Sequence, residues 1–162
     1  MNIYLLRHCE SLFNENETND LINCSLSRRG IEQAKQINLN SIEKQFNLVI
    51  CSPLYRSIQT FIYSTLSFQR LEVNNLFREI YLGCKSDLLH ENESISIDTD
   101  ESIRQRLEQI QRFLVNLKQF NYENVLIVTH ADLVWNLTSR EFDGETFGQW
   151  LQNGEVFFWK QI

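Results

Sequence analysis

The sequence has little glycine and proline, with five Gly and a single Pro among its 162 residues, and this argues against a disordered, collagen-like or linker-rich chain. No block of lysine or arginine occurs, and the formal net charge is −6, so no nucleic-acid partner is expected. Long apolar runs are also missing: Val125–Val128 is far too short to cross a bilayer, and Met1–Arg7 lacks the layout of a signal peptide. We therefore expect a cytoplasmic protein without a membrane partner.

The cysteines include no Cys-x-x-Cys pair, and without a secretory signal we expect reduced thiols. Their spacing relative to the three histidines matches no known zinc pattern, so a metal site is not expected either. The four cysteines are Cys9, Cys24, Cys51 and Cys84.

The chain is rich in apolar residues, which make up 43% of it and include eleven Phe and three Trp. Its length suits one domain spanning 1–162 with a proper core. We find neither an internal repeat nor a domain boundary.

Short apolar runs alternate with helical patterns, which predicts an α/β fold: a three-layer sandwich with a mostly parallel sheet and helices on both faces. The expected strands are Asn2–Leu6, Leu48–Cys51, Leu71–Asn74, Val125–Val128 and Val156–Trp159.

Helical spacing appears between these strands. One expected helix carries Ile31, Ala34 and Ile37 after a serine N-cap; another has Ser52 as N-cap and Pro53 at its first position, and buries Leu54, Ile58, Phe61, Ile62 and Thr65. A longer helix follows the spacing of Ile103, Leu107, Ile110, Leu114 and Leu117, and a short one begins near Asp132. The polar, acidic stretch from Gly83 to Ser102, which includes His90, is expected to form a solvated loop, often a lid over a site.

Polar clusters follow three of the predicted strands: Arg7-His8, Ser52 to Arg56, and Thr129-His130. The carboxyl ends of parallel strands share one edge of a sheet, where ligands bind, so we expect these clusters to converge. Phosphoryl transfer requires a nucleophile together with fixed positive charge around the phosphoryl oxygens.

The clusters contain candidates for each of these roles. Arg7 and Arg56 carry planar, charged guanidinium groups whose paired N–H donors match the geometry of phosphate oxygens. One imidazole could attack phosphorus while the other, protonated, donates to the phosphoryl oxygens. A carboxylic acid, Glu79, could protonate the departing alkoxide.

The motifs in their order along the chain resemble the histidine phosphatase superfamily, the phosphoglycerate mutase-like proteins, in the branch with the Arg-His-Gly signature. The match spans essentially the whole chain. The stretches that carry it are Leu6–Ser11, Asn14, Leu26–Ala34, Ser52–Thr60, Glu79–Gly83, Val128–Ala131 and Asn153–Glu155.

This resemblance implies a phosphoglycerate mutase-like fold and a metal-free phosphatase that uses a phosphohistidine and no cofactor. The substrate would be a phosphorylated small molecule or a phosphoprotein. The implied roles are His8 as nucleophile, Arg7, Asn14, Arg56 and His130 as ligands of the phosphoryl group, and Glu79 as proton donor and then base. Glu79 must be protonated near neutral pH, so its pKa must be raised.

Two departures from the family pattern stand at the site, since Cys9 and Ala131 replace glycines that follow the two histidines. A side chain there could crowd the pocket, which leaves open a weak or inactive phospho-ligand binding module. Cys9 is expected to be a packed thiol rather than a redox switch, and Asp132 a helix N-cap that points away from the phosphate.

A phosphoglycerate mutase is disfavoured, because Ile80 stands where an arginine for the substrate carboxylate is expected. The natural substrate and the oligomeric state stay open.

Overall fold

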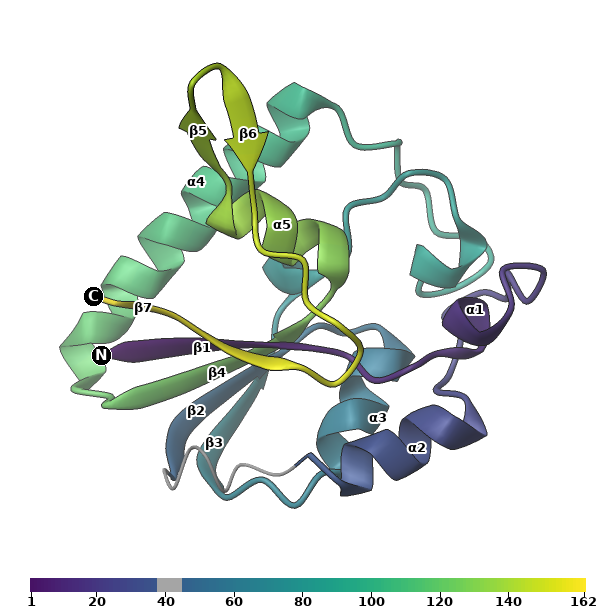
Figure 1. Ribbon diagram of the computed structural model, residues 1–162, viewed down its shortest axis with the longest axis horizontal. Coiled ribbons are helices and arrows are strands. Elements are labelled where there is room, and N and C mark those ends of the chain that lie inside the picture. The colour runs from purple at the N-terminus through teal and green to yellow at the C-terminus, as the bar shows by residue number, and fades with distance from the viewer. Residues whose placement is uncertain (38–44) are drawn as a thin grey trace.

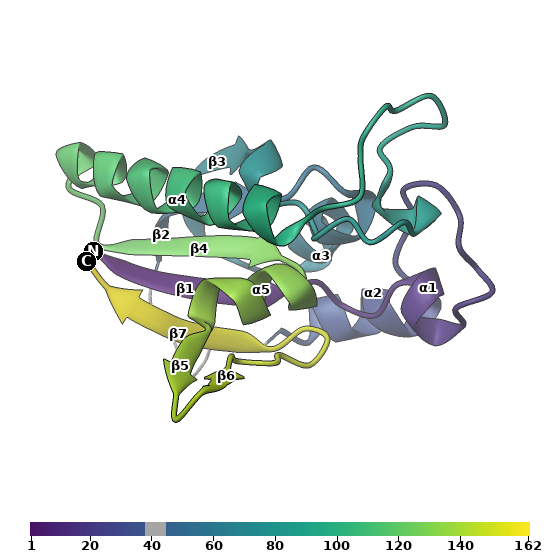
Figure 2. The same cartoon turned by 90° about the horizontal axis from the view of Figure 1, so that it is seen from above.

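The computed structural model describes residues 1–37 and 45–162 and is built around a five-stranded sheet. The strands are β1 (Asn2–Arg7), β2 (Phe46–Cys51), β3 (Phe68–Val73), β4 (Asn124–Thr129) and β7 (Val156–Gln161). Their order is β3-β2-β4-β1-β7, and only β7 runs antiparallel to its neighbour. In Figure 2, β1 and β4 run the same way while β7 returns, so that the two chain ends meet at one side of the sheet.

Helices cover both faces of this sheet, as Figure 1 shows, and the predicted α/β sandwich with a mostly parallel sheet is confirmed. On one face lie α2 (Arg28–Lys35) and α3 (Tyr55–Tyr63), and on the other α4 (Asp100–Asn116) and α5 (Ala131–Thr138). Among the described residues, none of the helices is both long and apolar enough to span a membrane.

Two apolar cores follow from the alternation of side chains along the central strands. Every residue of β4 is buried. Val125 and Ile127 join the core under α4 and α5, whereas Leu126 and Val128 join the one under α2 and α3. The continuous apolar run in the sequence is therefore what a strand buried on both faces requires.

The remaining elements are short. A β-hairpin that the sequence analysis did not predict joins β5 (Arg140–Phe142) to β6 (Glu145–Phe147) through Asp143 and Gly144, both at positive φ, as a tight two-residue turn requires. The others are α1 (Leu12–Glu15) and the 3₁₀ helices η2 (Asn75–Phe77), η3 (Lys85–Asp87) and η4 (Leu117–Phe120).

The prediction for α3 was wrong in two respects. Helix α3 begins at Tyr55, with Leu54 in the N-cap position, so neither Ser52 nor Pro53 caps or opens it. Its buried residues are polar: Arg56, Ser57 and Thr60.

The predicted apolar face of α3 is correspondingly incomplete. Ile62 is 64% exposed, and Thr65 lies exposed beyond the end of the helix. The helix is rotated so that its polar side faces the loop after β1 and the loop after β4, where those side chains find hydrogen-bond partners. The predicted residues Leu54, Ile58 and Phe61 do pack against the core, so the buried side of α3 combines part of the apolar face with polar side chains that find partners.

Other predicted boundaries shift by a few residues. Strand β3 begins at Phe68 rather than Leu71, and α4 begins at Asp100, capped by Thr99, rather than at Ile103. Ser27 is the N-cap of α2, as expected, and its hydroxyl accepts the amide of Gly30 at 2.9 Å.

Candidate active site

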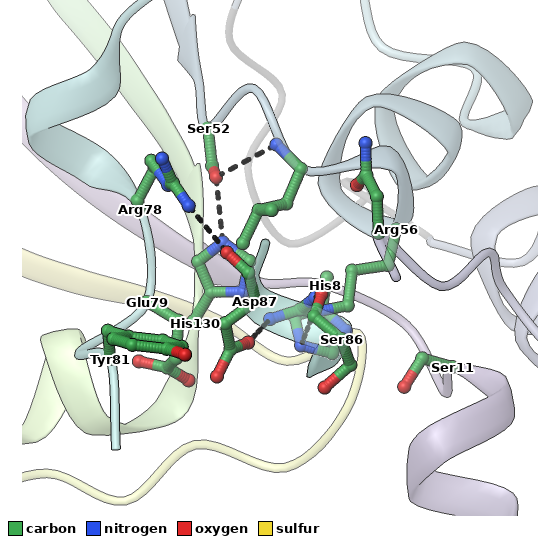
Figure 3. Close-up of polar contacts among 12 residues, drawn as sticks. His8, Ser11, Ser52, Arg56, Arg78, Glu79, Tyr81, Ser86, Asp87 and His130 are labelled. Atoms are coloured by element: carbon green, nitrogen blue, oxygen red, sulfur yellow. Dashed lines mark hydrogen bonds and ion pairs between the residues drawn. The ribbon is translucent and has the colours of Figure 1, made fainter. Parts of the chain in front are cut away.

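A cavity of about 140 Å³ opens beyond the carboxyl ends of β1 and β4. Of the predicted clusters, Arg7, His8 and Arg56 line it, whereas His130 does not line it but packs beside His8. Figure 3 shows the side chains of His8, Arg56, Glu79 and His130 gathered in this region. The residues that line the cavity are Arg7, His8, Ser11, Phe13, Asn14, Arg56, Glu79, Ile80, Leu82, Cys84, Ser86, Asp87, Ala131, Asp132 and Trp150.

His8 follows β1 and is almost fully buried, with 3% of its surface exposed. Its Nδ1 lies 2.7 Å from the carbonyl oxygen of Cys9, and since a carbonyl only accepts, Nδ1 carries the proton. Nε2 therefore holds a lone pair, which accepts a hydrogen bond from Nε of Arg56 at 3.2 Å. Burial, and then the charge of Arg56, hold the pKa of His8 well below its ordinary value, so the ring is neutral at neutral pH.

Arg56 is fixed by groups from the loop after Gly83. Its Nη1 donates to the carbonyl oxygen of Ser86 at 2.7 Å, and its Nη2 pairs with the carboxylate of Asp87 at 2.5 Å. Both side chains of this ion pair are nearly buried, at 5% and 11% exposure. The guanidinium is thus held in one orientation with its Nε toward His8.

His130 is completely buried beside His8, with the two ring centroids 5.0 Å apart. Its Nε2 lies 2.7 Å from the hydroxyl of Ser52 and 3.3 Å from that of Ser57, while its Nδ1 has no partner among the described residues. Burial, and then the charge of Arg56, hold the pKa of His130 well below its ordinary value. The protonated second histidine that was expected during phosphoryl transfer stays a prediction about the complex with substrate. A phosphate dianion beside the ring would favour the charged form.

Glu79 lines the cavity from the loop after η2, and its Oε1 accepts the amides of Ile80 at 3.0 Å and Leu133 at 3.1 Å. Burial raises the pKa of Glu79 to about 7, and the nearby carboxylate of Asp132 adds to the effect. The carboxyl group is therefore poised to be protonated near neutral pH, as a proton donor requires.

Asp132 does not cap α5. The N-cap position belongs to His130, and Asp132 lines the cavity from the first turn of the helix. The expectation that it points away from the site is therefore wrong. Burial raises the pKa of Asp132 as well, while the charge of Arg7 works in the opposite direction.

Arg7 and Asn14 complete the predicted set at the cavity wall. Arg7 donates to the carbonyl oxygen of Leu151 at 2.7 Å, and its guanidinium lies 5.7 Å from the centre of the Trp150 ring. The Oδ1 of Asn14 accepts from the amide of Ser11 at 3.2 Å and from Asn153 Nδ2 at 3.1 Å. The backbone amide of Asn14 donates to the hydroxyl of Ser11 at 3.1 Å, so its side-chain nitrogen Nδ2 is the group that this arrangement leaves for a ligand.

The two residues that replace the expected glycines lie differently. Cys9 is fully buried in the core under α2 and α3 and does not line the cavity. Its backbone amide donates to Thr60 Oγ1 at 2.9 Å, and burial raises the pKa of its thiol to about 11. Cys9 is therefore a packed thiol that leaves the pocket free. Ala131 does line the cavity, with a single methyl group.

A family model described as "Histidine phosphatase superfamily (branch 1)" matches residues 3–153. The chain belongs to this superfamily. The resemblance seen in the motifs is thereby confirmed.

Relatives and solved structures agree with this assignment. The adenosylcobalamin/alpha-ribazole phosphatase of Escherichia coli (strain K12) is 26% identical over 161 residues, covering 86% of this chain and 78% of that protein. The phosphoglycerate mutase from Thermus thermophilus shares the fold with a TM-score of 0.65 at 20% identity, over 96% of this chain and 91% of that one. The alpha-ribazole phosphatase from Shigella flexneri does so with a TM-score of 0.57 at 22% identity, over 93% and 96%.

Sequence reasoning missed several side chains of the site. Asp87 was seen only as part of an acidic loop, and nothing in the local sequence shows that it pairs with Arg56. Ser57 was included in the motif Ser52–Thr60 but was given no role, and Trp150 was missed. A polar residue one position after Arg56, on the same buried helix side, is the signal that could have indicated a role for Ser57.

Gly30 generates a testable prediction about the loop that follows His8. A Cβ at Gly30 would lie 1.9 Å from the carbonyl oxygen of Glu10, which also accepts the amide of Ser27 at 2.9 Å. Helix propensity alone predicts that Gly30→Ala stabilises the protein by up to about 1 kcal/mol. The clash with backbone predicts the opposite sign, a destabilisation of about 1–3 kcal/mol in urea unfolding.

The control is Arg28→Ala, an exposed residue two positions earlier in the same helix. Its effect should stay within about 0.5 kcal/mol of the parent protein. A Gly30→Ala variant more stable than the parent would show that the close approach to Glu10 is wrong.

Proposed function

We propose that this chain is a phosphatase that hydrolyses a phosphomonoester through a phosphohistidine formed on Nε2 of His8. The observation that carries the proposal is the state of His8: a neutral ring with one tautomer and its lone pair directed to the guanidinium of Arg56 in a cavity. The relationship to an alpha-ribazole phosphatase supports a small-molecule substrate.

In the first step Nε2 of His8 attacks phosphorus, and the bond between phosphorus and the leaving oxygen breaks. Arg7 and Arg56 stabilise the charge on the phosphoryl oxygens. His130, buried with its ring centroid 5.0 Å from that of His8, is the second imidazole beside the phosphoryl group. Glu79 gives its proton to the leaving alkoxide, which departs as an alcohol.

In the second step a water molecule attacks the phosphohistidine. Glu79, now a carboxylate, takes a proton from that water as the bond between phosphorus and Nε2 breaks. Inorganic phosphate leaves, His8 regains its lone pair and Glu79 is again protonated. A pKa of about 7 suits both roles, because neither the acid nor the base form of Glu79 is then strongly disfavoured at neutral pH.

The two alternatives have less support. The binding-module hypothesis rested on Cys9 and Ala131, and Cys9 is turned away from the cavity. The mutase hypothesis requires a basic residue near Glu79 for a substrate carboxylate. Ile80, which stands at that position, is apolar and 3% exposed.

The first prediction concerns the nucleophile. The protein should hydrolyse p-nitrophenyl phosphate in the presence of EDTA, and His8→Ala should lower kcat by roughly a thousandfold or more. His90→Ala is the matched control, because His90 is exposed and does not line the cavity. A folded parent protein that binds vanadate without turnover, or a His8→Ala variant with full activity, would contradict the proposal.

The second prediction concerns Glu79. Only the protonated carboxyl can donate, so kcat/KM for an alkyl phosphate should fall as the pH rises through about 7. The charge of Asp132 helps to raise the pKa of Glu79, so Asp132→Asn should lower that pKa and move the falling limb to lower pH.

The control for this pH profile is Glu108→Gln on the exposed side of α4, which should leave the profile unchanged. A falling limb that stays in place or moves to higher pH in Asp132→Asn would show that these two carboxyl groups do not interact as described.

A further inference from the structure

The apolar part of the cavity lining comes from three segments of the chain. We call it the apolar wall: Phe13 of α1, Ile80 and Leu82 after Glu79, and Trp150 before β7. Leu82 is 59% exposed and Trp150 is 49% exposed, so these two lie at the cavity mouth, whereas Ile80 is buried. None of the proposed phosphoryl-transfer steps uses these side chains.

The size of the cavity makes the apolar wall relevant to the substrate. Pockets that enclose a whole small-molecule ligand usually measure about 300–1,000 Å³. A cavity of about 140 Å³ encloses much less than that. With the phosphoryl group at His8, the leaving group must extend outward to the mouth, over Leu82 and Trp150.

The charged residues that line the cavity disfavour a substrate with an anionic group in addition to its phosphoryl group. The cations of the lining are Arg7 and Arg56, which the phosphoryl group itself requires. Its carboxyl groups are those of Glu79, Asp87 and Asp132. Asp87 is already paired with Arg56, and Glu79 is protonated up to about pH 7. A carboxylate on the leaving group would therefore meet the carboxyl group of Asp132 and find no cation of its own in the lining.

Neighbouring cations do not change this balance. Arg78 is paired with Glu93 at 2.5 Å, and Arg106 is paired with Asp98 at 3.3 Å, both outside the cavity lining. Lys85 is exposed and does not line the cavity. To gain a partner, a negatively charged leaving group would have to break one of the two arginine pairs or draw in the exposed Lys85.

Trp150 presents a partly exposed aromatic ring that neighbouring side chains hold in place. The guanidinium of Arg7 lies 5.7 Å from its ring centre, and the ring of Trp135 packs edge-on at 6.5 Å between centroids. These contacts fix the ring while about half of the residue stays exposed at the mouth. A flat ring on the leaving group can stack there at little cost in side-chain ordering.

Resting on the phosphatase function proposed above, we infer that the substrate is a phosphomonoester whose leaving group is aromatic and carries no negative charge. The apolar wall binds the ring, and the cavity lining has no cation beyond Arg7 and Arg56 to receive a carboxylate or a second phosphate. Small carboxylated phosphomonoesters such as phosphoserine or 3-phosphoglycerate are therefore poor substrates.

Three alkyl-type esters separate these features: benzyl phosphate, 4-carboxybenzyl phosphate and ethyl phosphate. We expect kcat/KM for benzyl phosphate to exceed that for 4-carboxybenzyl phosphate by roughly tenfold or more. It should exceed that for ethyl phosphate by about three- to tenfold. Equal or better hydrolysis of the carboxylated ester would overturn the inference while leaving the phosphatase function intact. A protein that hydrolyses none of these three esters and no p-nitrophenyl phosphate would overturn both this inference and the proposed phosphatase function.

Variants of the apolar wall test which residues carry the preference. Trp150→Ala should raise KM for benzyl phosphate and lower its kcat/KM by about three- to tenfold, with little change for ethyl phosphate, and Trp150→Phe should restore most of the loss. Phe142→Ala is the control, an aromatic residue 76% exposed on β5 and away from the cavity. Equal losses for both esters would show that Trp150 only holds Arg7, and would count against the inference.

Leu82→Arg adds a cation at the cavity mouth and so tests whether the lack of one disfavours carboxylated substrates. An added cation at the mouth should raise kcat/KM for 4-carboxybenzyl phosphate by roughly two- to fivefold, while that for benzyl phosphate does not rise. An unchanged ratio between the two esters would contradict the claim that a missing cation sets the preference.

Discussion

A single hydrogen bond, from Nδ1 of His8 to the carbonyl oxygen of Cys9 at 2.7 Å, determines which ring nitrogen is available to a substrate. If that carbonyl turned away, the proton could move to Nε2 and the lone pair would face the backbone instead of the cavity. Much of the surrounding structure holds this carbonyl in place. The amide of Cys9 donates to Thr60, and the amide of Gly154 donates to the carbonyl oxygens of Arg7 and His8 at 3.1 and 3.3 Å.

The electrostatics of the site depend on burial more than on any one charge. Burial is the largest cause of the lowered pKa values of both histidines and of the raised pKa of Glu79. The same desolvation keeps His8 neutral and keeps the carboxyl group of Glu79 protonated to about pH 7. One enclosed cavity thus prepares a nucleophile and a proton donor together, and Arg56 supplies the charge that the phosphoryl group needs.

The sequence predicted the fold, and the place of the site, because both depend on local patterns. Apolar runs mark the strands, and the carboxyl ends of parallel strands bring Arg7, His8, Arg56 and His130 to one edge. What it did not predict depends on contacts between distant segments. The rotation of α3 is set by partners on two other loops, and Asp87 meets Arg56 across 31 positions.

Asp132 shows the same limit on a smaller scale. Its position before an apolar helical stretch is typical of an N-cap, but the backbone after β4 places His130 there instead. The catalytic roles of His8 and Glu79 stay predictions.

The most direct test of the account is to quench turnover of ³²P-labelled p-nitrophenyl phosphate within milliseconds and map the labelled peptide. The account predicts a phosphoryl group on the peptide that contains His8, stable in alkali and labile in acid, and absent in His8→Ala. Label on any other side chain, or turnover with no covalent label at any quench time, would contradict it.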